Sequence, residues 1–148
     1  MLPVANPVPD TLVVEQFVRA APAEVFADLT TPARMLKWWG DPAKWWLTNA
    51  EVEPRAGGRW WLHWESAKGG KNEMGGTFRT LDPGKSFVLA FIASHAKERT
   101  DEVLFQIRPD GDGSRVILRH SGLAGRREHF ADYEKGWALI LSWLAKQY

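Results

Sequence analysis

The 148-residue chain contains no cysteine, which excludes a disulfide framework and any metal site built on thiolates. A domain of this length hides roughly 68–70% of the surface of its unfolded chain, so a hydrophobic core can stabilise it without such cross-links. No apolar run approaches the ~20 residues that span a bilayer, and prolines interrupt the first ten residues, where a signal peptide needs a cationic and apolar stretch. We therefore expect a cytoplasmic protein with no membrane span.

The chain also lacks an excess of charge of one sign. It contains 19 lysines and arginines and 18 acidic residues, which gives a formal charge of +1. Such a balance creates no general field for nucleic acid or an anionic membrane. Tyrosine is scarce with two residues, whereas tryptophan is abundant with nine, seven of them between positions 38 and 64. Because no basic groove accompanies these indoles, base stacking is not indicated, and their concentration needs another explanation.

The first part of the chain predicts a strand followed by two short helices. Prolines at positions 3, 7 and 9 indicate a flexible leader over residues 1–10, followed by a single domain over 11–148. Alternating valines over 11–19 predict the strand. Pro22 and Thr31-Pro32 are typical helix starts, and the second helix is expected to stop at Gly40.

The rest of the chain predicts a run of strands closed by one long helix. Turn signals at hairpin spacing separate six segments of period two, near 47–54, 58–66, 73–82, 85–93, 101–109 and 114–121. Apolar residues at helical spacing then predict an amphipathic helix over 126–147. The fold class is therefore α+β, with a seven-stranded antiparallel sheet whose concave face the last helix covers, leaving a cavity between them.

Several strings in this order resemble the helix-grip superfamily of START-like and polyketide-cyclase-like proteins, also called SRPBCC. More narrowly, the chain is similar to single-domain bacterial homologues of the activator of heat-shock protein 90 ATPase. The strings are Ala21–Phe26 (APAEVF), Thr31-Pro32 leading to Trp38-Trp39, Pro54–Trp60 (PRAGGRW), Gly76-Thr77-Phe78 with Leu81-Asp82-Pro83, Ser114–Leu123 (SRVILRHSGL) and Gly136-Trp137. The resemblance implies a small-molecule cavity, but one scaffold in this superfamily serves carriers, receptors, cyclases and cochaperones.

The first functional hypothesis is the binding of a small hydrophobic, aromatic or lipid-like molecule, without a cofactor, between the sheet and the last helix. The residues expected to line the cavity are Val14, Phe26, Trp39, Trp61, Phe78, Phe91, Phe105, Leu118, Trp137 and Leu141, with His120 or Arg59 as a polar anchor. Each tryptophan taken alone is as well explained by core filling, and His120 beside apolar neighbours by a hydrogen-bonded core histidine. No histidine spacing indicates a metal site.

Two alternatives remain open at this stage. The first is a cofactor-free cyclase or hydrolase acting on a polyketide-like substrate, in which His120, or His63 with Glu65, moves a proton. His63 and Glu65 share a strand face with Trp61. Either they enter the pocket beside Arg59, or they lie on the solvated outside of the sheet. The free-energy cost of burying a carboxylate favours the outside. The second is a cochaperone-like ATPase activator, although the balanced charge shows no docking patch. The sequence is compatible with a monomer or a homodimer.

Overall fold

The computed structural model describes residues 8–93 and 99–148. In chain order the elements are β1 (Thr11–Val18), α1 (Pro22–Thr30), α2 (Pro32–Trp38), β2 (Gly40–Asp41), β3 (Trp45–Val52), β4 (Arg59–Ser66), β5 (Lys71–Asp82), β6 (Ser86–Ile92), β7 (Asp101–Asp110), β8 (Gly113–Ser121) and α3 (Arg127–Lys146). The predicted α+β class is confirmed, with element ends within a few residues of those expected. Of the predicted leader, residues 1–7 lie outside the described residues.

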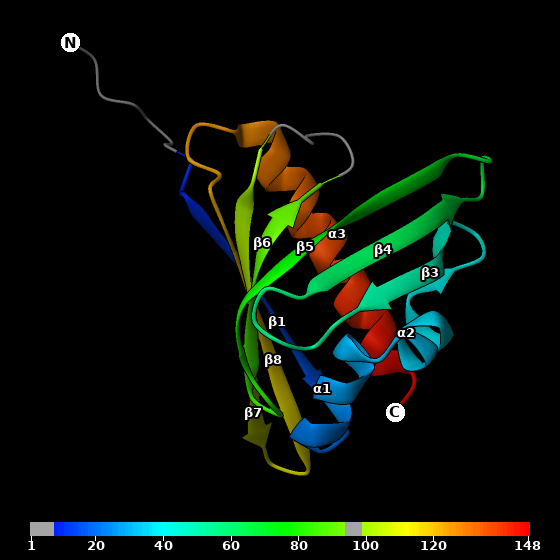
Figure 1. Cartoon of the computed structure of the whole chain (residues 1–148), viewed down its shortest axis with the longest axis vertical. Coiled ribbons are helices and arrows are strands. Elements are labelled where there is room, and N and C mark those ends of the chain that lie inside the picture. The colour runs from blue at the N-terminus through cyan, green and yellow to red at the C-terminus, as the bar shows by residue number, and fades with distance from the viewer. Residues whose placement is uncertain (1–7, 94–98) are drawn as a thin grey trace.

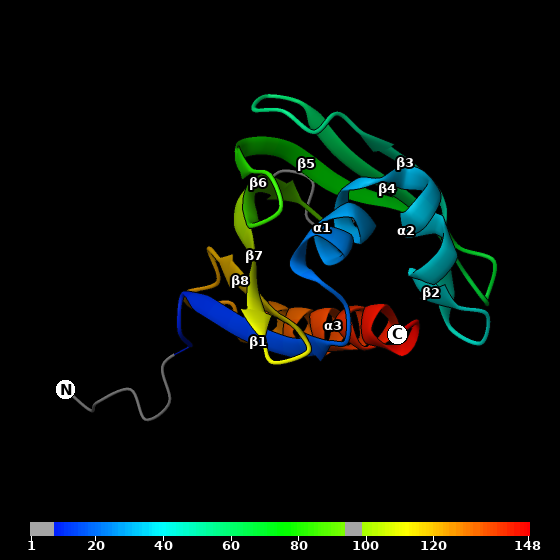
Figure 2. The ribbon, with the colours of Figure 1, turned by 90° about the horizontal axis from the view of Figure 1, so that it is seen from below.

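All strands form one antiparallel sheet in the order β1-β8-β7-β6-β5-β4-β3-β2. Val14, Leu118, Phe105 and Phe87 stand opposite one another across β1, β8, β7 and β6, so this row of apolar side chains faces one side. The sheet curls strongly around α1 and α3, as the view from below shows (Figure 2), and Phe105 of this row contacts Trp137, which lies on α3. The apolar face of the sheet is therefore its concave face.

The described sheet has eight strands, whereas the sequence predicted seven. The additional strand is the two-residue β2, in which Gly40 and Asp41 pair with Trp46 and Trp45. Gly40 has φ +148°, and a Cβ atom there would lie 2.5 Å from the Cα of Trp46. The glycine that was expected only to end a helix thus also lets the chain turn directly onto the sheet.

Helix α3 lies across the open side of the curled sheet and contacts both β1 and β2 (Figures 1 and 2). Its buried residues are Trp137, Ile140, Leu141, Trp143 and Leu144. Helices α1 and α2 sit inside the curl beside the C-terminal end of α3 (Figure 2). No helix in the described parts of the chain is long and apolar enough to cross a bilayer.

Aromatic rings fill most of the space beneath α3. Trp60 lies at the centre, with ring centroids 5.8 Å from Trp39, 6.4 Å from Phe87 and 6.1 Å from Phe105. Phe105 continues the series to Trp137 of α3 at 5.8 Å. Because this cluster closes the middle of the interior, any open space must lie toward one end.

Candidate functional site

A pocket of about 190 Å³ lies between α3 and strands β3 to β6, beyond the aromatic cluster. Its lining residues are Trp45, Trp64, Met74, Phe91, Ala93, Asp132, Tyr133, Gly136, Trp137 and Ile140. Strand periodicity brings Trp64 and Met74 to the concave face, and helical spacing brings Tyr133, Gly136 and Trp137 to the covering face. The pocket is mainly aromatic and opens to solvent on one side.

Gly136 explains why α3 does not fill this space. A Cβ atom at Gly136 would meet no atom within 4 Å, so close packing does not require the glycine. A glycine inside a helix costs about 1 kcal/mol relative to alanine, and this one lines the pocket. The missing side chain leaves room that a larger residue would occupy.

Three polar groups belong to this mainly apolar wall. Asp132 is exposed and makes no ion pair among the described residues. Trp64 lines the pocket, and its buried Nε1–H has no hydrogen-bond partner in the described structure. Burial, with the nearby Asp101 carboxylate, raises the pKa of Tyr133 to about 12, so its hydroxyl is neutral near pH 7. A buried donor without an acceptor costs free energy in the folded protein.

A buried polar network stands behind the pocket wall. His120 Nε2 lies 2.9 Å from Asp101 Oδ2, and Trp137 Nε1 lies 3.0 Å from His120 Nδ1. Arg126 Nη1 donates to both carboxylate oxygens of Asp101, at 3.1 and 3.3 Å, and to the carbonyl oxygen of Gly122. The ring of Tyr133 packs over His120, with centroids 4.4 Å apart. The network therefore fixes two residues of the pocket wall, Trp137 and Tyr133.

These contacts determine the protonation of His120. An indole N–H can only donate, so Nδ1 of His120 must accept, and Nε2–H then donates to Asp101. Burial lowers the pKa of His120, and this effect outweighs the opposing attraction of Asp101. His120 is thus neutral, has both ring nitrogens engaged, and does not line the pocket. It positions Trp137 and has no nitrogen available to a substrate.

The face of β4 that holds Arg59, Trp61 and His63 is turned away from the pocket. Arg59 lies over the Trp61 ring at 5.1 Å and lies 3.7 Å from Glu51, to which His63 is also bonded at 3.2 Å. The expectation that Trp61 and Arg59 line the cavity is therefore wrong, because the sheet curls toward the other face of β4.

Glu65 shares this outer face and pairs with Lys71 at 3.9 Å, so the interior Arg59–Glu65 pair considered from the sequence does not form. His63 lies 3.6 Å from a second carboxylate, that of Glu73. The solvated interpretation of His63 and Glu65 agrees with this placement. Within residues 8–93 and 99–148, no three histidines or acidic residues are grouped so that they could hold a metal ion.

Most of the other expected lining residues fill the core instead. Only Phe91 and Trp137 of the predicted set line the pocket. The residues that face the interior but lie outside the lining are Val14, Phe26, Trp39, Phe78, Phe105, Leu118, His120 and Leu141. Trp45, Trp64 and Tyr133 were not predicted to line it, although Tyr133 belongs to the apolar stripe of the last helix and Trp64 alternates with Trp60.

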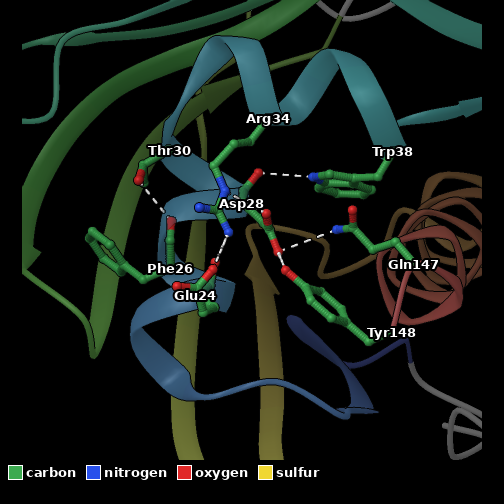
Figure 3. Close-up of polar contacts among 8 residues, drawn as sticks. All are labelled: Glu24, Phe26, Asp28, Thr30, Arg34, Trp38, Gln147 and Tyr148. Atoms are coloured by element: carbon green, nitrogen blue, oxygen red, sulfur yellow. Dashed lines mark hydrogen bonds and ion pairs between the residues drawn. The ribbon is translucent and has the colours of Figure 1, made fainter.

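A second polar network closes the far end of the molecule (Figure 3). The buried carboxylate of Asp28 accepts hydrogen bonds from Arg34 Nε at 2.8 Å, from Gln147 at 3.3 Å and from the hydroxyl of Tyr148. The backbone carbonyl of Asp28 accepts from Trp38 Nε1 at 2.9 Å. These bonds join α1 and α2 to the end of α3, so the network maintains the shape of the interior from the end opposite the pocket.

The sequence matches the model of the family described as "Activator of Hsp90 ATPase homolog 1-like protein" over residues 19–147. A comparison with curated proteins gives no match.

Solved structures share the fold. A protein from Rhodobacter sphaeroides superposes with a TM-score of 0.81 at 18% identity, covering 96% of this chain and 95% of its own. The AHSA1-like protein from Aeromonas hydrophila has a TM-score of 0.75 at 20% identity, covering 92% and 90%. The AHSA1 protein from Silicibacter pomeroyi has a TM-score of 0.75 at 25% identity, covering 93% and 96%.

Proposed function

The chain belongs to the family of activator of Hsp90 ATPase homolog 1-like proteins, and on that premise we propose that it binds one small, largely apolar molecule in the pocket beneath α3. The observation that carries the proposal is the pocket itself. It stays open at the end of an interior that aromatic rings otherwise fill, and its mainly apolar lining includes the carboxylate of Asp132. Concave, mainly apolar spaces with a few polar groups are typical ligand sites.

The volume limits the ligand. An apolar cavity of about 150 Å³ accommodates benzene, whereas sites for drug-sized molecules measure roughly 300–1,000 Å³. A pocket of about 190 Å³ therefore suits a single ring with a short substituent, or the end group of a lipid-like molecule. The geometry supports binding over the cyclase or hydrolase alternative, because the histidine nearest the pocket wall has both ring nitrogens engaged.

Replacement of Gly136 by phenylalanine should weaken this binding. The parent protein should show saturable quenching of tryptophan emission with the one-ring probes p-cresol and benzyl alcohol. Because the added ring enters space where a Cβ meets nothing within 4 Å, Gly136→Phe should weaken probe binding at least tenfold, about 1.4 kcal/mol.

The matched control is Ala138→Phe, which adds the same ring at an exposed position of the same helix. This variant should bind the probes as the parent does. Equal affinities in Gly136→Phe and the parent, or no saturable binding of either probe to the parent, would refute the proposed function.

A further inference from the structure

We propose that the pocket selects a quaternary alkylammonium group, an inference that rests on the proposed function and specifies its ligand. The proposal follows from the chemistry of the lining, which combines five aromatic rings with one carboxylate. The rings belong to Trp45, Trp64, Phe91, Tyr133 and Trp137.

Neighbouring rings of the lining are inclined to one another. The Trp45 and Trp64 centroids are 5.0 Å apart at an interplanar angle of 50°, and those of Phe91 and Trp137 are 5.6 Å apart at 58°. Inclined rings leave ring faces and edges open to a guest, which closely stacked rings would not. The face of an aromatic ring attracts a cation within about 6 Å, by about 2 kcal/mol or more where water is excluded, and tryptophan does so best.

The charges around the pocket favour a cation over an anion. Asp132 is the single charged residue of the described lining, and it has no ion pair among the described residues. The guanidinium of Arg126, behind Tyr133, is bonded to the Asp101 carboxylate. Among the described lining residues an anionic ligand would therefore meet the Asp132 carboxylate and no cationic side chain. The cations that act on Tyr133 from outside the lining are Arg126, which is bonded to Asp101, and Arg99.

A quaternary ammonium is favoured over a primary one because the lining of the pocket is mainly apolar. A primary ammonium group keeps strongly bound water, and its transfer into an aromatic pocket would leave several N–H groups without acceptors. A quaternary ammonium presents methyl groups, has no N–H, and fits with a short chain into about 190 Å³.

Choline and its neutral analogue 3,3-dimethylbutan-1-ol test this inference, because they have the same shape and hydroxyl and differ only by nitrogen in place of carbon. Choline should bind at least tenfold more tightly, measured by tryptophan quenching and by calorimetry. Asp132→Asn should weaken choline binding three- to tenfold and leave the neutral analogue unchanged. Glu134→Gln, an exposed neighbour on the same helix, should change neither.

The outcomes separate the two proposals. If the neutral analogue binds as tightly as choline, or if Asp132→Asn affects both probes equally, the pocket binds apolar shape alone and the ammonium inference is overturned while the proposed function stands. If neither probe binds, and p-cresol and benzyl alcohol also fail, both proposals fall together.

Discussion

Replacing Asp101 with alanine should lower the free energy of unfolding by about 3–5 kcal/mol, because it leaves a buried guanidinium without its counter-charge. The side chain of Arg126 is 10% exposed, and its Nη1 donates to both oxygens of Asp101. The same change removes the acceptor of His120 Nε2. Urea unfolding of the parent and the variant would measure the difference.

Asp112 provides the matched control, since its carboxylate is 68% exposed and lies 3.8 Å from a similarly exposed Arg19. Asp112→Ala should change stability by no more than about 0.5 kcal/mol. Comparable losses in the two variants would show that solvent reaches Arg126 readily and that the network behind the pocket is not closed.

Stability should also fall as the pH drops below about 6.5, and His120 should account for part of that fall. Burial lowers the pKa of His120 in the folded protein, whereas in the unfolded chain this pKa has its ordinary value near 6.5. Between these two pKa values the unfolded chain binds a proton at this histidine and the folded chain does not. The loss begins as the pH falls through about 6.5, grows by up to about 1.4 kcal/mol per pH unit, and stops at the folded-state pKa.

Unfolding measured at pH 7.5, 6.5 and 5.5 in the parent and in His120→Gln would test this assignment. His120→Gln should flatten the pH dependence by up to one proton, whatever its effect on absolute stability. A parental slope in His120→Gln would assign the acid sensitivity to other groups.

The order of elements was predictable because it depends on local patterns. Period-two segments bounded by turn residues identified the long strands, and proline at the first helical position identified α1 and α2. Strand β2 was missed because two residues carry no periodicity, and its pairing depends on the close approach of Gly40 to Trp46. A contact of this kind is set by the tertiary structure.

The candidate site was less predictable, because it depends on which face the curled sheet turns inward. Alternation separates Trp60 from Trp61 but does not say which of them is buried, and Trp60 is the core residue. The partners of His120 come from positions 101 and 137, on β7 and α3, so no local motif joins them. Their arrangement becomes visible only when the strands are paired.

The abundance of tryptophan now has distinct explanations at different positions. Trp38 and Trp60 are core residues whose indole groups donate to backbone carbonyls of α1, at 2.9 and 3.0 Å. Trp45, Trp64 and Trp137 line the pocket. Trp38 and Trp60 thus fill the core without lining the pocket, whereas Trp137 belongs to both, so the indole N–H groups can report where a ligand binds.

Titration of the ¹⁵N-labelled protein with the tightest binder among p-cresol, benzyl alcohol and choline tests the central claim most directly. Binding in the pocket should move the indole N–H resonances of Trp64 and Trp137 and leave those of Trp38 and Trp60 in place, because the latter two are bonded to α1. Saturable shifts confined to Trp61 on the outer face, or shifts in Trp38 and Trp60 without change in Trp64 and Trp137, would contradict it.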